Sequence, residues 1–156
     1  MALQQARVGA DIGHRLWAYP PHSLALAVPF GVPGYFLSLA FWSALGLAAL
    51  AFGAWRAGFS GWATAMLLLS PASLLCIYWG QTGNLACGLL LVALSGRRQF
   101  DGTAVAATVA LTIKPRFGIL LPLLWLIERR WSLIAAASLA TAAVFALSVA
   151  VGGWSL

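Results

Sequence analysis

Residues 111–118, with the sequence LTIKPRFG, interrupt a long apolar stretch with a cation on either side of a proline. Lys114 and Arg116 are the only charged residues between positions 102 and 127. Two interpretations are open: one kinked helix that carries both cations at mid-bilayer, or two short helices that meet at a turn on one membrane face. Proline disfavours a helical conformation at the preceding residue, and a cation at the bilayer centre costs about 2.5–3.5 kcal/mol. Both arguments favour two short helices that meet at Lys114 and Pro115.

The composition indicates an integral membrane protein. Of the 156 residues, 62% are hydrophobic and 8% are charged, whereas an average soluble domain has roughly 25% charged residues. The net charge of +6 does not indicate nucleic-acid binding, because the basic residues lie singly or in pairs between apolar runs. Cys76 and Cys87 are too few and too unfavourably spaced for a zinc site. No cofactor or metal is expected, since no acidic pair is available on the outer face to hold an ion.

The apolar runs predict an all-α fold, a polytopic transmembrane helix bundle. A bilayer core of about 30 Å needs roughly 20 apolar residues in a helix. About six membrane-crossing helices are predicted, two of them short, over residues 34–55, 61–79, 82–95, 102–113, 117–128 and 131–152. The segment near residues 21–33 has only a short apolar run between prolines, so we expect it to be re-entrant or interfacial. These elements form a single membrane domain over residues 1–156.

The charges predict which way the bundle is oriented. Counting crossings places five arginines on one side, and the positive-inside rule makes this side the cytoplasm: Arg56, Arg97, Arg98, Arg129 and Arg130. An unbroken helix over 102–127 would move the last two arginines to the outside. Lys114 and the polar stretch GQTGN, residues 80–84, with Gln81, are therefore predicted to be extracytoplasmic.

Lys114 and Arg116 are candidates for binding an anion at the outer face, such as a phosphate or an anionic lipid head group. A helix that starts after Pro115 would add its N-terminal dipole and free N–H groups to the same place. The alternative is that both side chains only anchor a helix end by snorkelling. Gln81 and Asn84 offer amide groups to sugar hydroxyls or phosphate oxygens, although GQTGN is also typical of a turn.

Three stretches, in this order and spacing, resemble glycosyltransferase family 87, bacterial membrane proteins of the GT-C class. They are WAYPPHSLALAVPFGVPGYF (17–36), SPASLLCIYWGQTGN (70–84) and GTAVAATVALTIKPRFGILLPLLWLIERRW (102–131), and the resemblance runs from about Trp17 to Trp154. Tyr19 begins the match to the family's YPP, Gly80 and Gln81 match its GQ, and Lys114 and Pro115 match its KP. The sequence departs from the family where Arg116 replaces a common Gln and where Asn84 is displaced from the usual Asn.

The resemblance implies a reaction and a set of binding residues. A sugar, mannose in the similar enzymes, passes from a polyprenyl-phosphate donor to a glycolipid or glycan acceptor at the extracytoplasmic face of the bacterial plasma membrane, by inverting displacement. The donor phosphate is expected near Lys114, Arg116, Gln81 and His22, and the sugar or acceptor near Asn84 and Tyr19. The alternatives are an ordinary solvated histidine at His22 and a rigid entry turn at YPP, which contains Tyr19.

The general base is the missing part of this expected site. The family uses an Asp in the first outer loop, just after an initial transmembrane helix, and we expect that this helix and the family's C-terminal helices lie outside a partial sequence. Asp11 is the only acid predicted on the outer face and is the candidate base, although an ordinary loop acid is the alternative. We therefore expect the fragment alone to be inactive. A second hypothesis is a non-catalytic carrier or flippase-type subunit that binds polyprenyl phosphates.

Overall fold

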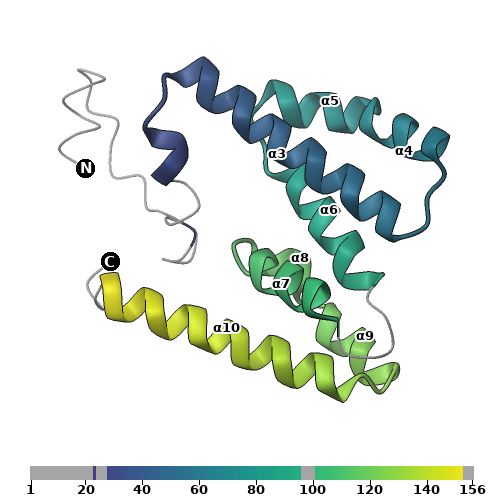
Figure 1. The fold of residues 1–156 in the computed structure, drawn as a ribbon, viewed down its shortest axis with the longest axis vertical. Helices are drawn as coiled ribbons and strands as arrows, with labels where there is room; N and C mark the ends of the chain where they lie inside the picture. Colours follow the sequence, from purple (N-terminus) through teal and green to yellow (C-terminus); the bar gives the residue numbers. More distant parts are fainter. Residues whose placement is uncertain (1–22, 24–27, 96–100, 153–156) are drawn as a thin grey trace.

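The computed structural model describes residues 23, 28–95 and 101–152, and the elements within these ranges are helical (Figure 1). They are η1 (Val28–Gly31), α3 (Tyr35–Arg56), α4 (Gly61–Leu68), α5 (Pro71–Tyr78), α6 (Gly83–Leu94), α7 (Gly102–Leu111), α8 (Pro115–Gly118), α9 (Leu121–Ile127) and α10 (Trp131–Gly152). No strand occurs in the described ranges, so the predicted all-α membrane bundle is confirmed. Of the segment predicted to be re-entrant, the described part from Val28 forms only the four-residue η1.

Among the described residues, two helices are long and apolar enough to cross a membrane alone. They are α3 and, within α10, the stretch Trp131–Ala150. The helices α6 and α7 have 12 and 10 residues, which is fewer than the roughly 20 that a bilayer core needs. The bundle therefore combines full-length helices with short apolar ones.

Residues 61–79, which were predicted to form one span, are divided in the structure into α4 and α5, which are bent by 46° relative to each other. Pro71 occupies the first turn of α5, and the hydroxyl of Ser70 accepts a hydrogen bond from the backbone N–H of Ser73 at 3.3 Å. A serine N-cap followed by a proline is a helix start. The sequence SP thus begins a new helix, and the pair forms a third candidate span only if both helices count as one.

The break at Lys114 is confirmed, and the single kinked helix over 102–127 is excluded. Helix α7 ends at Leu111, Lys114 has φ −126° and ψ 82°, and α8 begins at Pro115. Non-helical torsions are those that a following proline favours. The chain then folds back, since a Cβ at Gly118 would lie 3.7 Å from the Cβ of Leu111.

Small residues let α3 and α6 approach closely. A Cβ at Gly53 would overlap the carbonyl group of Gly88, and a Cβ at Gly88 would overlap the backbone of Ala49. Close helix crossings at small residues are the usual way in which membrane helices gain packing energy. On its other side α6 packs against α7, and α7 packs against α10 (Figure 1). A buried apolar cluster joins these helices to α9: Ala86, Val92, Ala93, Ala104, Ala107, Leu111, Leu121, Trp125, Leu133 and Ala137.

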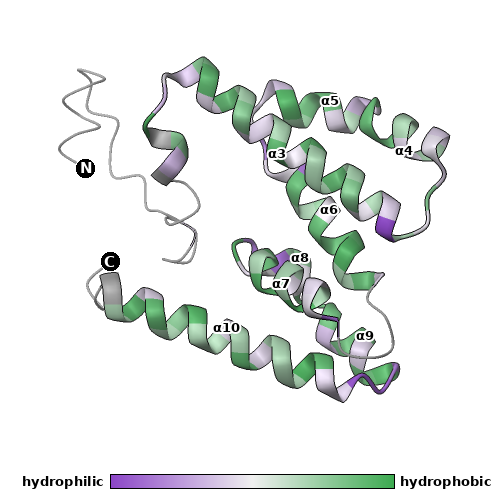
Figure 2. Cartoon of the chain, viewed as in Figure 1, coloured by the Kyte–Doolittle hydropathy of each residue, from purple (hydrophilic) through white to green (hydrophobic). Residues whose placement is uncertain are grey.

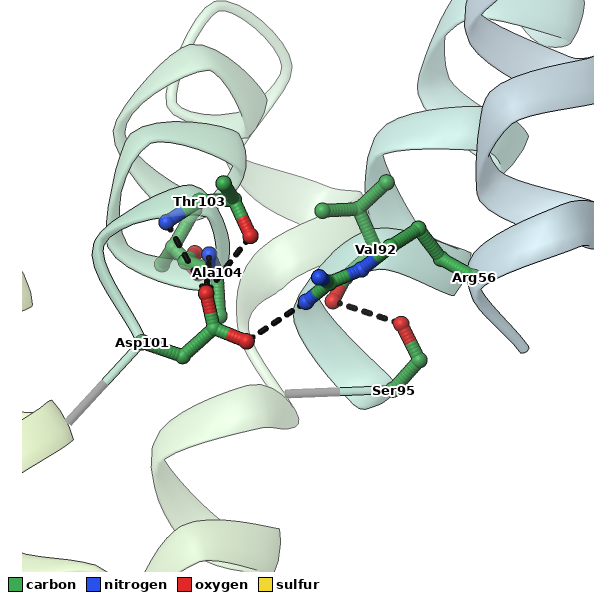
Figure 3. A network of polar contacts seen from close by, with 7 residues as sticks. Arg56, Val92, Ser95, Asp101, Thr103 and Ala104 are labelled. Atoms are coloured by element: carbon green, nitrogen blue, oxygen red, sulfur yellow. Dashed lines mark hydrogen bonds and ion pairs between the residues drawn. The ribbon is translucent and has the colours of Figure 1, made fainter. Parts of the chain in front are cut away.

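Hydrophilic residues lie near the ends of the helices, and the helix bodies are hydrophobic (Figure 2). Arg56, the last residue of α3, pairs with Asp101, the N-cap of α7, at 2.5 Å between Nη2 and Oδ2 (Figure 3). The last turn of α6 lies beside this pair, with the Ser95 hydroxyl donating to the Val92 carbonyl. Asp101 also accepts from the backbone N–H of Thr103 at 3.0 Å. The charged pair therefore ties the end of α3 to the start of α7, beside the end of α6.

We name two ends of the bundle. The arginine end comprises the Arg56–Asp101 pair and the loop between α9 and α10, in which Arg130 Nε lies 2.7 Å from Glu128 Oε2. The lysine end comprises the turn at Lys114, the turn at residues 79–84 and the start of α3. The number of membrane crossings and the order in which the helices cross stay predictions. Which end faces the cytoplasm stays a prediction, and Arg97 and Arg98 lie outside the described residues.

Candidate functional site

The GQ motif at the lysine end forms a helix cap. Gly80 has a φ of 60° and donates its N–H to the carbonyl of Ile77 at 3.1 Å, and Gln81 donates its N–H to the carbonyl of Cys76 at 2.8 Å. These two bonds are those of a Schellman motif, in which the left-handed residue is usually glycine. The motif ends α5 and turns the chain toward α6, and the side chain of Gln81 is exposed at this turn.

Asn84 lies in the first turn of α6 but points into the bundle. Its side chain is buried, with 7% exposed, and Nδ2 donates to the carbonyl of Ser73 at 3.2 Å. Satisfying a buried amide in this way ties α6 to α5. Asn84 therefore has a structural role in joining these two helices. Its role as a sugar ligand stays a prediction.

Lys114 and the GQTGN stretch come together around a small cavity of about 20 Å³. Half-buried Lys114 lines it from the turn after α7, and Thr82 lines it from the turn before α6. The hydroxyl oxygen of Thr82 is buried and has no hydrogen-bond partner among the described residues. A cavity of this size holds about one water molecule. The structure thus brings a cation and a buried hydroxyl group from two separate motifs into one place.

An open groove of about 440 Å³ adjoins this cavity, and we call it the aromatic groove. It is lined by Phe30, Tyr35, Ser38, Leu39, Trp42, Trp79 and Gly80. Trp42 lines both the groove and the Lys114 cavity. Its ring meets the ring of Phe30 edge to face, with 5.1 Å between the centroids and 86° between the planes, which is a favoured geometry for aromatic pairs.

Trp42 is a site residue that the sequence analysis did not identify. A signal for it was present, because Tyr35, Ser38, Leu39 and Trp42 have the spacing i, i+3, i+4 and i+7 of one helix face. That face of α3 forms one wall of the groove. Aromatic residues near helix ends also indicate interfacial anchors. For that reason the helix face that these four residues form was not recognised from the sequence.

Arg116 does not share the cavity that Lys114 lines. Its side chain is exposed, its guanidinium carbon lies 5.1 Å from the ring centroid of Phe117, and it lines neither the cavity nor the groove. The helix expected after Pro115 does begin there but ends after four residues. Since a helix dipole sums over aligned peptide units, so short a helix adds little to the site.

Three predicted site residues cannot be placed relative to the lysine end. Asp11, Tyr19 and His22 lie outside the described residues. Both described acids, Asp101 and Glu128, form ion pairs with arginines at the arginine end. What the described residues assemble is a lysine and a hydroxyl group beside a groove with aromatic walls, an arrangement suited to an anion that carries an apolar or ring-shaped group.

Comparison with known proteins is informative at the level of the family. The family model described as glycosyltransferase family 87 matches residues 17–156. No curated protein and no solved structure matches the chain.

Proposed function

The chain belongs to glycosyltransferase family 87, and we propose that it transfers a sugar, mannose by resemblance, from a polyprenyl-phosphate donor to a glycolipid or glycan acceptor. Family membership with the apolar helices makes it a membrane glycosyltransferase. The donor, the inverting stereochemistry and the location at the extracytoplasmic face of a bacterial plasma membrane are parts of the proposal.

The cavity that Lys114 and Thr82 both line is the observation that carries this proposal. Lys114 belongs to the KP motif and Thr82 directly follows the GQ motif, although the two residues are 32 positions apart in the sequence. An ammonium group and a hydroxyl group are both suitable donors to phosphate oxygens. We propose that the donor phosphate binds at the rim of this cavity, which is too small to enclose it, with Gln81, Arg116 and His22 as further candidates around it.

In the proposed reaction the acceptor hydroxyl attacks the anomeric carbon of the donor from the face opposite the phosphate. The new carbon–oxygen bond forms while the bond to the phosphate oxygen breaks, and a carboxylate takes the proton of the hydroxyl. Negative charge grows on the departing polyprenyl phosphate. A cation held at that phosphate stabilises the transition state more than the bound donor, which accelerates the transfer.

A second groove offers space for the prenyl chain. It has a volume of about 560 Å³ and lies between α7, α9 and α10, with walls that include Thr112, Trp125, Ala137 and Phe145. Thr112 is two residues from Lys114, so a chain in this groove would begin close to the proposed phosphate position. Burial of apolar chain atoms against such walls is favourable.

The carboxylate base is the part of the mechanism that the described residues do not supply, since Asp101 and Glu128 are paired at the arginine end. We propose Asp11, or a carboxylate beyond this sequence, as the base. In the second case the chain alone would bind the donor without turnover. Tyr19 and Asn84 remain proposed ligands of the sugar or acceptor.

The test is a donor-consumption assay on membranes that contain the product of the whole gene. Mannosyl undecaprenyl phosphate is supplied with a glycolipid extract, and both released undecaprenyl phosphate and the anomeric configuration of the product are measured. Acceptor-dependent release with inversion supports the proposal. Donor binding without release in any extract indicates the carrier function instead. In the active preparation, an Asp11→Asn variant that retained full turnover would assign the base elsewhere.

A further inference from the structure

We propose that the aromatic groove holds a pyranose ring and that Trp42 is the surface on which this ring stacks. The inference rests on the proposed function, because it assigns the sugar-binding part of the same site. The motifs predict no site residue in α3. Trp42 is identified as a candidate because it lines both the Lys114 cavity and the aromatic groove.

The chemistry of the groove suits a sugar. Its walls include the rings of Tyr35, Trp42 and Trp79, and the negatively polarised face of an aromatic ring attracts the positively polarised C–H groups of a pyranose. The Ser38 hydroxyl, also in the wall, donates to the backbone carbonyls of Pro33 and Gly34, each at 3.2 Å. Its oxygen retains the capacity to accept from a sugar hydroxyl.

The position of Trp42 fits a sugar bonded to a phosphate. One cavity that Trp42 lines also contains Lys114 and Thr82, and the other is the aromatic groove. In a sugar phosphate the ring and the phosphorus share one bridging oxygen, so the two groups must occupy adjoining places. A phosphate at Lys114 therefore puts the sugar ring within reach of Trp42.

Anchoring at the membrane interface explains Trp42 less well than it explains its neighbours. Tyr35 and Trp79 are exposed aromatic residues at helix ends, as interfacial anchors usually are. Trp42 lies seven residues further along α3, about 10 Å along the helix axis, and is half-buried. The edge-to-face contact with Phe30 also fixes its ring, which prepares the ring face for a ligand.

The experiment measures binding of three probes to the purified protein in detergent. The probes are undecaprenyl phosphate, mannosyl undecaprenyl phosphate, and methyl α-mannoside in the presence of saturating undecaprenyl phosphate. Trp42→Leu keeps an apolar side chain without a ring face, and Trp42→Phe keeps a ring. The matched control is Trp62→Leu, which replaces an exposed tryptophan on α4. Circular dichroism checks that each variant is folded.

We expect Trp42→Leu to lower the affinity for at least one mannose-bearing probe about threefold to tenfold and to leave the affinity for undecaprenyl phosphate unchanged. Trp42→Phe should retain most of the affinity, and Trp62→Leu should change none. A loss with the mannosylated lipid assigns the ring to the donor, and a loss with methyl mannoside alone assigns it to the acceptor. The inference would be overturned if Trp42→Leu bound both mannose-bearing probes as tightly as wild type does, or if it lost as much affinity for undecaprenyl phosphate as for these probes.

The failure of the proposed function has a different signature. If Lys114→Ala binds undecaprenyl phosphate as wild type does, the phosphate position is wrong. A loss of methyl α-mannoside binding in Trp42→Leu would still support the sugar position, because that probe carries no phosphate.

Discussion

The arginine end and the lysine end of the bundle use cations in opposite ways. At the arginine end Arg56 pairs with Asp101, and Arg130 pairs with Glu128. At the lysine end the described neighbours of Lys114 in its cavity are a hydroxyl group and apolar or aromatic side chains. No acid in the described part of the chain lies at that end. One end neutralises its charges internally to join helices, and the other presents a cation beside a groove.

This difference teaches how a small apolar bundle separates stability from binding. An ion pair with a buried partner links two helix ends, and removing one partner leaves the other charge uncompensated. A positive charge beside an open groove attracts anions from outside the protein. Variants at the two ends should therefore affect different measurements.

The largest expected effect is the loss of phosphate binding in Lys114→Ala. Removing a charged hydrogen-bond donor should lower the affinity for undecaprenyl phosphate by about tenfold to a hundredfold, with little change in thermal stability. Arg129→Gly is the control, because it also removes one cation but lies at the arginine end, and glycine suits the φ of 55° at this position. Equal losses in both variants would show that net charge, not the lysine end, binds the lipid.

The α3–α6 crossing supports both ends of the bundle. Gly88→Leu should therefore affect both thermal stability and lipid binding. A side chain at Gly88 meets the backbone of Ala49, and overpacking costs about 1–3 kcal/mol. We expect a lower midpoint of thermal unfolding together with weaker lipid binding. Ala48→Leu adds a similar volume to an exposed position of α3 and should change neither. A Gly88→Leu protein as stable as wild type would contradict the close crossing.

Asp101→Asn should separate the two ends. Asparagine still caps α7, but the ion pair with Arg56 is lost, which should lower stability by about 1–2 kcal/mol. Affinity for undecaprenyl phosphate should be unchanged. Glu128→Gln is the comparison, because the side chain of Glu128 is 40% exposed and that of Asp101 only 9%, and an exposed pair contributes less. Calorimetry of both variants makes the test, and a larger effect at Glu128 would refute the assignment.

The smallest effect is expected at the two helix caps. Gly80 and Arg129 both have positive φ, and a side chain in that conformation costs roughly 1 kcal/mol. Gly80→Ala should therefore be destabilising, the more so because its Cβ would lie 3.2 Å from Leu39 Cδ1. Arg129→Gly should be neutral or slightly stabilising. Unfolding midpoints that moved in the opposite directions would contradict the two cap assignments.

The breaks in the helices could be predicted from local chemistry. The Lys114–Pro115 break followed from a proline between two cations in an apolar run, and the structure confirms it. The break at Ser70 and Pro71 carried an equally local signal, a serine cap with a proline in the first turn. It was missed because the surrounding run has a suitable length for one span.

The contacts between distant segments could not be predicted in the same way. The helical face that carries Trp42 is visible in the sequence, but which motif it meets depends on how α3 crosses α6. That crossing depends on the close approach of Gly53 and Gly88, and the sequence does not show that these two distant glycines contact each other. For the same reason the burial of Asn84 against Ser73 was not evident from a stretch that is typical of a turn.

The opposite placement of the two ends is the central claim, and a topology map tests it most directly. Single cysteines replace Gln81, Arg116 and Arg129, all exposed, in a protein without Cys76 and Cys87, and intact cells are treated with a membrane-impermeant maleimide. We predict that positions 81 and 116 are labelled in intact cells and that position 129 is labelled only after permeabilisation. Labelling of position 129 from outside, with positions 81 and 116 protected, would contradict the account.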